Sequence, residues 1–173
     1  MSAVVLNTLY ASGRNFLYPM LFSVLRKNGF VKSSDHNKDI PDLLNLPPDV
    51  FVHGHFLLGD TFGYYQMLHK PYKHIFLHRD LRDALVSGMS YDRNCTITDG
   101  RPLHTVLKQM SELDALKYIV GKQVDTTIVT AHRLLSLKGG IETARRCFND
   151  PKVCCTSFEA LKADTEGELR RIF

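Results

Sequence analysis

The sequence predicts an α/β fold in which a central, mainly parallel sheet is flanked by helices. Two observations support this prediction. Short runs of β-branched and apolar residues recur along the chain, and between them apolar residues repeat at every third or fourth position, as on one face of a helix. Because segments of the two kinds alternate, strand–helix–strand units with parallel pairing are favoured. The length of 173 residues corresponds to about one domain, so we expect a single domain over residues 1–173.

The N-terminal segment predicts a strand, a turn and a helix. The strand is expected at Ala3–Leu9 and the turn at 10–13. Apolar residues then recur at helical spacing over Phe16–Leu25, and Asn28-Gly29 is a suitable place for the helix to end. Pro19 lies inside this stretch, so we expect either a late helix start or a kink.

The middle of the chain predicts two more strands. The polar, proline-containing stretch 32–50 is expected to be a loop with at most a short helix at Ile40–Leu44. Strands follow at Val50–His55 and Lys73–His78, with a helix between them at Thr61–His69.

The strand at Lys73–His78 leads directly into a helix that is expected to run through Tyr91, with Asp80 and Asp83 at its N-terminus. Thr165 and Glu168 form a capping box that opens a last helix over Glu166–Phe173. Three elements are expected in between: a helix at Leu103–Val120, a helix within 128–148 and a short strand at Val153–Thr156.

The charge and the apolar runs exclude two classes of protein. The chain has 22 basic and 18 acidic residues, a net charge of +4 with His neutral. This excess is too small to indicate nucleic-acid binding, but it is compatible with a small anionic ligand. No apolar run approaches the roughly 20 residues that a membrane-spanning helix needs, so we expect no membrane span.

The four cysteines indicate a reducing compartment. Cys95, Cys147, Cys154 and Cys155 match no zinc or redox spacing, and they are best interpreted as small apolar residues. The first residues also lack the features of a secretory signal. A cytoplasmic location is therefore predicted.

The first strand–helix turn has the features of an anion-binding loop. Ser12, Gly13, Arg14 and Asn15 stand between the strand and the helix, where backbone N–H groups and the positive end of the helix dipole face one point. The sequence is not the GxxxxGK[ST] loop, because its lysine is absent. An ordinary connection is the alternative interpretation.

A second turn with a basic residue follows the third strand. Arg79 stands between this strand and the next helix, and Ser87 follows eight residues later. An arginine at this place is able to bind a phosphate in a forked geometry. Alternatively, Arg79 forms a structural ion pair with Asp80 or Asp83.

The segment Ile75–Ser87 resembles the 3′-phosphate-binding segment of sulfotransferases that use 3′-phosphoadenosine 5′-phosphosulfate (PAPS). That family has the signature R-[DN]-x-[RK]-D-x-x-x-S, and every fixed position is present from Arg79 to Ser87. Ser12-Gly13 lies where the family has its P-[KR]-S-G-[TN]-[TS] loop, and 158–164 resembles its Y-E-D-L-K-x-[DN] segment. The resemblance implies a P-loop-like nucleotide-binding architecture.

The resemblance also implies roles for single residues. Arg79 and Ser87 would bind the 3′-phosphate of PAPS, and the loop Ser12–Asn15 would bind the 5′-phosphosulfate. Phe158 stands at the position of the tyrosine that stacks on adenine. The implied reaction transfers a sulfuryl group from PAPS to a hydroxyl or amine of a small-molecule or glycan acceptor, with PAPS as co-substrate and no metal.

Two departures from the family pattern favour an alternative, a catalytically impaired PAPS- or nucleotide-binding protein. Ala11 replaces the basic residue that stabilises charge on the leaving group, and Arg14 compensates only if it folds back over the bridging oxygen. The family's later R-K-G segment has no counterpart before Phe173, so we expect a C-terminally truncated domain. A P-loop kinase is disfavoured, because the loop lysine is absent.

His55 is the candidate general base. It ends the predicted strand 50–55 where the family has its catalytic histidine, and an imidazole suits proton transfer near neutral pH. A structural histidine and a metal ligand paired with His53 are the alternatives, although a metal site needs further ligands.

Overall fold

A computed structural model describes residues 2–9, 12–33, 44–54, 66–94, 106–122 and 144–173. The predicted α/β fold is confirmed: five parallel strands form one sheet in the order β2-β3-β1-β4-β5. The strands are β1 (Val4–Thr8), β2 (Val31–Lys32), β3 (Val50–Gly54), β4 (Lys73–His78) and β5 (Val153–Ser157). β1 is buried along its whole length, as the central strand of a sheet that is covered on both faces.

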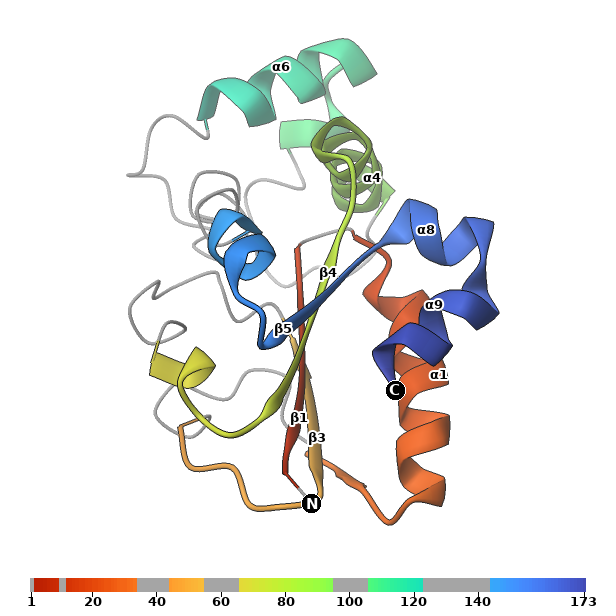
Figure 1. Ribbon diagram of the computed structural model, residues 1–173. Helices are drawn as coiled ribbons and strands as arrows, with labels where there is room; N and C mark the ends of the chain where they lie inside the picture. The colour runs from red at the N-terminus through yellow and green to blue at the C-terminus, as the bar shows by residue number, and fades with distance from the viewer. Residues whose placement is uncertain (1, 10–11, 34–43, 55–65, 95–105, 123–143) are drawn as a thin grey trace.

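Helices cover both faces of the sheet (Figure 1). One face packs against α1 (Arg14–Lys27), α8 (Phe158–Ala163) and α9 (Thr165–Ile172). The other face packs against the short helical segments 66–68 and 144–149. Alternate residues of β1 point to opposite faces of the sheet. Val4 and Leu6 face α1, whereas Val5 faces the layer formed by 66–68 and 144–149.

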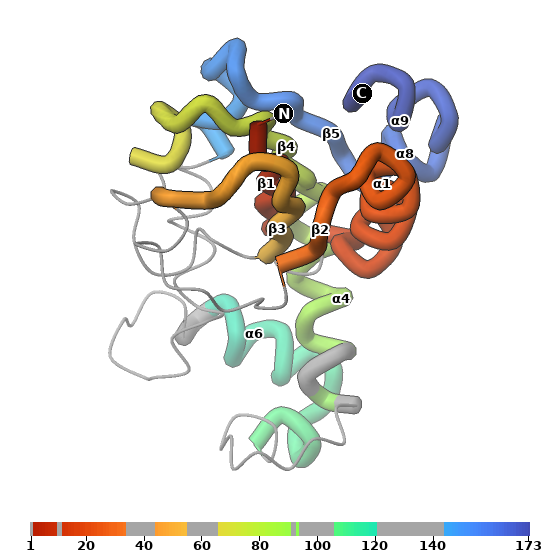
Figure 2. The backbone as a smooth tube through the Cα atoms, turned by 90° about the horizontal axis from the view of Figure 1, so that it is seen from below, coloured from red at the N-terminus to blue at the C-terminus, as the bar shows by residue number. Residues whose placement is uncertain are grey.

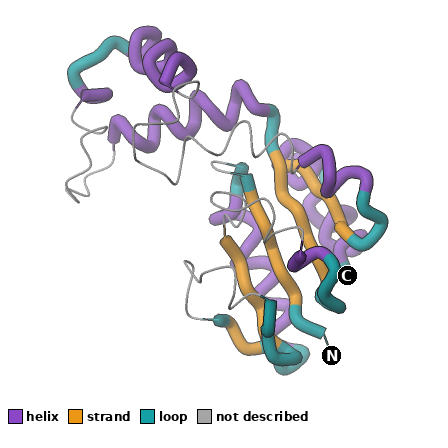
Figure 3. The backbone as a smooth tube through the Cα atoms, turned by 90° about the vertical axis from the view of Figure 1, so that its left-hand side faces the viewer, coloured by secondary structure: helices purple, strands orange, loops and turns teal. Residues whose placement is uncertain are grey.

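The helices α4 (Leu81–Asn94) and α6 (Glu112–Lys122) extend beyond the carboxyl edge of the sheet (Figures 1 and 3). Together with the helical turn 106–108 they form a small core around Met89, Leu107 and Ala115. The carboxyl edge of the sheet therefore lies between the main body and this helical unit.

The chain reverses its direction of travel across the sheet at β1. After β1 it crosses by α1 to β2 and returns through β3, and then it continues on the other side through β4 and β5 (Figure 2). The crevice between β1 and β4 is therefore a topological switch point, where open α/β sheets bind ligands at the carboxyl ends of the strands.

The structure corrects or narrows three expectations about helix boundaries. α1 begins at Arg14, so of the two alternatives at Pro19, a late start or a kink, the late start is excluded. A proline at this position removes only the bond to the carbonyl of Asn15, and the buried residues Leu17 and Leu21 hold the helix on the sheet. The helix expected at Leu103–Val120 is also interrupted.

In that second case the helical turn 106–108 ends before Ser111, and α6 begins at Glu112. The Oγ of Ser111 accepts a hydrogen bond of 3.1 Å from the N–H of Asp114. Ser111 is therefore the N-cap of a new helix.

The third correction concerns the capping box. Asp164, not Thr165, caps α9: its Oδ1 accepts a 2.8 Å bond from the N–H of Gly167. Thr165 instead donates to the carbonyl of Leu161, and Glu168 accepts from Thr156 of β5 at 2.6 Å. The glutamate thus ties α9 to the sheet.

The other strands and helices lie close to their predicted positions. α4 continues three residues beyond Tyr91, and β2 was not predicted. The helix expected at Ile40–Leu44 falls largely outside the described residues, as do the first part of the helix at Thr61–His69 and most of 128–148.

Candidate functional site

The carboxyl ends of three adjacent strands lie side by side. Thr8 of β1 is paired with Leu77 of β4, and His78 of β4 is paired with Ser157 of β5. The pairing continues into the first turn, where the N–H of Leu9 donates to the carbonyl of Leu77 at 3.1 Å. The turns that begin α1, α4 and α8 therefore meet at one edge (Figure 1).

The turn after β1 requires a glycine. Gly13 is the N-cap of α1 and has a φ of +92°, in the left-handed region that favours glycine. Its carbonyl accepts bonds from the N–H groups of Phe16 and Leu17 at 2.9 and 3.2 Å. The first turn of α1 is thereby aligned toward the edge.

No side chain of the described residues caps α1. The four other helices listed above have such caps: Asp80 for α4, Ser111 for α6, Ser157 for α8 and Asp164 for α9. An uncapped helix N-terminus presents N–H groups and a positive dipole end, which suits an anionic ligand.

Ser12 points into the fold. It is fully buried, and its hydroxyl donates to the carbonyl of Leu9 at 2.5 Å. Its N–H donates to the same oxygen at 3.3 Å. Of the other loop residues, Arg14 is half-buried and Asn15 is exposed. Ser12 therefore shapes the turn, and its hydroxyl reaches a ligand only after rotation.

Phe158, the first residue of α8, connects the turns. A Cβ atom at Gly13 would lie 2.7 Å from Cε2 of the Phe158 ring, so the ring is packed against the bare backbone of the loop. Phe16 meets the ring edge-on at 6.1 Å between centroids. On the same ring lies the guanidinium group of Arg79, with Cζ 4.9 Å from the centroid. Gly13, Arg79 and Phe158 are thus brought together.

The ion pairs around the second turn differ from those considered from the sequence. Asp80 binds Arg82 through two hydrogen bonds of 3.1 and 2.9 Å, which lower the pKa of Asp80 to about 2. Arg79 instead faces Glu159, with Nε 3.9 Å from Oε1. Arg79 is thus directed toward β5 and α8.

For two further candidate residues, Ser87 and His55, the structure gives the surrounding element rather than a contact. Ser87 is half-buried on α4, three residues after the buried Ala84. His55 lies outside the described residues. Gly54, which precedes it, is paired with Asn7, and its carbonyl accepts a 3.1 Å bond from the hydroxyl of Thr8. The strand before His55 therefore ends beside β1.

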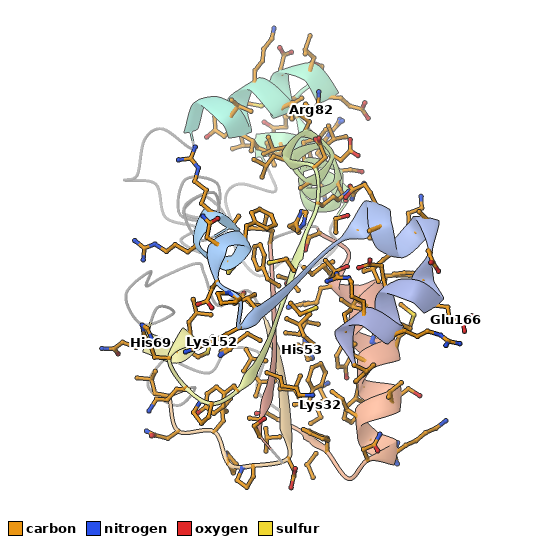
Figure 4. All side chains as sticks on the ribbon, viewed as in Figure 1. Lys32, His53, His69, Arg82, Lys152 and Glu166 are labelled. Carbon is orange, nitrogen blue, oxygen red and sulfur yellow. The ribbon has the colours of Figure 1, made fainter. Side chains whose placement is uncertain are left out.

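His53 is a buried residue between the sheet and α1 (Figure 4). Its ring stacks on Tyr18 of α1 with 3.9 Å between centroids. Lys32 lies over the same Tyr18 ring, with Nζ 4.8 Å from its centroid. Among the described residues, no group of three or more His, Cys, Asp or Glu side chains is arranged to hold a metal ion.

Comparison with known families decides the identity of this fold. The model of the sulfotransferase domain family matches residues 4–173. The chain belongs to the sulfotransferase domain family. Comparison with curated proteins and with solved structures gave no significant match. The sulfotransferase domain thus has the general chemistry of sulfuryl transfer, and its parallel sheet is the one predicted.

One residue of this candidate site was missed by sequence reasoning. Glu159 contacts both Arg79 and the backbone N–H of Asp80, although 79 residues separate Glu159 from Asp80 in sequence. In the sequence, only its position directly after Phe158 indicated that Glu159 could belong to the site. Within the described part of the chain, no helix combines the length and apolar character needed to cross a membrane.

Proposed function

We propose that this sulfotransferase domain transfers a sulfuryl group from PAPS to a hydroxyl or amine of a small-molecule or glycan acceptor. The observation that supports it most is the contact of Phe158 with both Gly13 and Arg79. Two turns that suit anions are thereby held beside one aromatic ring, and PAPS carries two anionic ends joined by an adenosine.

Each part of PAPS has a candidate partner in the proposed complex. The 5′-phosphosulfate lies at the uncapped start of α1, near Gly13, Arg14 and Asn15. Arg79 and Ser87 bind the 3′-phosphate. A base that stacks on Phe158 shares the ring with Arg79, which already lies over it.

The proposed chemistry depends on positioning and charge. The bond between sulfur and the bridging phosphate oxygen breaks, a bond from sulfur to the acceptor oxygen or nitrogen forms, and 3′-phosphoadenosine 5′-phosphate (PAP) leaves. The protein stabilises negative charge that spreads over the transferred group, as in phosphoryl transfer. Arg14 supplies positive charge at the sulfuryl group, and His55 takes the acceptor proton.

Calorimetric titration with PAP tests donor binding. Replacing Arg79→Ala removes a charged, forked contact worth about 1.5–3 kcal/mol, so the affinity for PAP should fall by about 10- to 100-fold. Arg82→Ala is the matched control, because it removes the same charge from an exposed side chain three residues away. Unchanged affinity in Arg79→Ala would refute the assigned site.

A second candidate function is a PAPS- or nucleotide-binding protein with impaired transfer. It is favoured by Ala11 at the position of the family's basic residue and by the hydroxyl of Ser12, which is bonded to Leu9. Loss of one preorganised charge donor costs several kcal/mol of transition-state stabilisation.

Transfer of radiolabelled sulfate from PAPS to a panel of phenols, alcohols and sugars separates the two functions. Activity that falls strongly in His55→Ala supports the enzyme with His55 as base. Tight PAP binding without transfer supports the impaired protein.

We also propose a cytoplasmic location. Cys154 and Cys155 are free thiols among the described residues, as expected in a reducing compartment.

A further inference from the structure

The carboxylate of Glu159 lies at the start of α4, although it belongs to α8. Its Oε1 accepts a 3.3 Å hydrogen bond from the N–H of Asp80 and lies 3.9 Å from Nε of Arg79. One oxygen thus meets both positive elements of this turn, the guanidinium and the backbone N–H at the helix N-terminus. These are the groups that an anionic ligand of the turn would use.

We propose that Glu159 occupies, in the empty protein, part of the anion site that the 3′-phosphate takes, so that donor binding displaces this carboxylate. The inference rests on the proposed function, because it takes Arg79 as the 3′-phosphate ligand. Because Glu159 competes for Arg79, it lowers the net electrostatic attraction between Arg79 and the nucleotide.

The two partners of the pair differ in their freedom to move. Arg79 lies against the ring of Phe158 and its side chain is 21% exposed, whereas that of Glu159 is 49% exposed. Glu159 stands in the first turn of α8, where a change of rotamer carries its carboxylate into water. The arginine therefore stays in place and the glutamate moves.

The charges favour this exchange. A 3′-phosphate brings close to two negative charges and several acceptor oxygens to Arg79, against one charge and a 3.9 Å approach from Glu159. If the carboxylate stayed beside the phosphate, the like charges would repel. Glu159 therefore weakens binding of any nucleotide that carries a 3′-phosphate.

This weakening is specific to one nucleotide class. Adenosine 5′-phosphate has no 3′-phosphate and leaves the contact between Glu159 and Arg79 undisturbed. Neutralising Glu159 should therefore raise the affinity for PAP and leave that for adenosine 5′-phosphate almost unchanged. A glutamate that merely supports the fold would affect both nucleotides alike.

Titration calorimetry with PAP and adenosine 5′-phosphate tests the proposal. In Glu159→Gln and Glu159→Ala the affinity for PAP should rise by about threefold to tenfold, the size expected when one half-exposed charge is removed. The affinity for adenosine 5′-phosphate should change by less than about twofold. Glu166→Gln is the matched control, since it neutralises an exposed carboxylate on α9 that pairs with Arg170.

A double variant locates the effect. In an Arg79→Ala background, Glu159→Gln should no longer raise the affinity for PAP, because the two residues act on one phosphate. Equal or weaker PAP binding in both Glu159 variants would overturn this inference alone. Unchanged PAP binding in Arg79→Ala would instead overturn the proposed function.

Discussion

The guanidinium group of Arg79 lies on the ring of Phe158, with 4.9 Å between Cζ and the ring centroid. The two residues are 79 positions apart in the sequence, and the pairing of His78 with Ser157 brings them together. A cation over an aromatic ring gains electrostatic attraction, and it gains most where water is partly excluded. The pair therefore links the proposed phosphate-binding turn to the proposed adenine platform.

Replacing Phe158→Ala should weaken PAP binding by about 5- to 100-fold, since base–aromatic stacking is worth about 1–3 kcal/mol. Phe158→Tyr should retain most of the affinity, because it keeps the ring. Calorimetry measures both. Phe148→Ala serves as control, because Phe148 is an exposed aromatic that packs on Phe76, on the other face of the sheet. Equal losses in the Phe158 and Phe148 variants would contradict the assignment.

Replacing Gly13→Ala should destabilise the fold by two additive effects. A side chain at a φ of +92° costs about 1–2 kcal/mol, and the collision of its Cβ with the Phe158 ring adds about 1–3 kcal/mol. Gly29→Ala isolates the first effect, because Gly29 has a φ of +85° with no atom within 4 Å of an added Cβ. Urea unfolding of both variants gives the difference, and equal losses would argue against the close packing.

Acid should destabilise the protein through His74. This side chain is 3% exposed, and burial lowers its pKa from 6.5 to about 4. Between these values the unfolded chain binds the proton more readily than the folded chain, so stability is present above pH 6.5 and is lost as the pH falls toward 4. The loss from His74 between pH 7 and pH 5 is about 2 kcal/mol.

Urea unfolding at the two pH values checks this expectation. His74→Gln should show a smaller loss on acidification than the unmodified protein. His69→Gln, at an exposed turn position, should show the full loss. If His74→Gln kept the full dependence, another group would be responsible.

The sheet could be predicted because its signal is local. Runs such as 73–78 combine β-branched and apolar residues and end at polar turns, and the predicted bounds of β4 agree with the structure. Helix ends were harder to predict, because neighbouring residues compete for the same role. Asp164 and Thr165 are both good caps, and Glu168, which would complete a capping box with Thr165, instead accepts a bond from Thr156 of β5 while Asp164 caps α9.

The turns of the candidate site could be predicted from the sequence, but the contacts between its residues could not. Gly13 and Arg79 stand at strand–helix junctions that the pattern of the sequence marks. The pairing of Arg79 with Glu159 depends on β5 lying beside β4. No periodicity reports such long-range pairing, so Asp80 and Asp83 seemed the natural partners.

The late position of β5 in the chain matters during synthesis. A nascent polypeptide that has emerged only as far as residue 150 carries β4 as an unpaired edge, since its partner Val153–Ser157 is still in the ribosome. Buried β4 residues such as Ile75 and Phe76 then await their final cover. The interval between the emergence of β4 and that of β5 is therefore the stage at which molecular chaperones have most to protect.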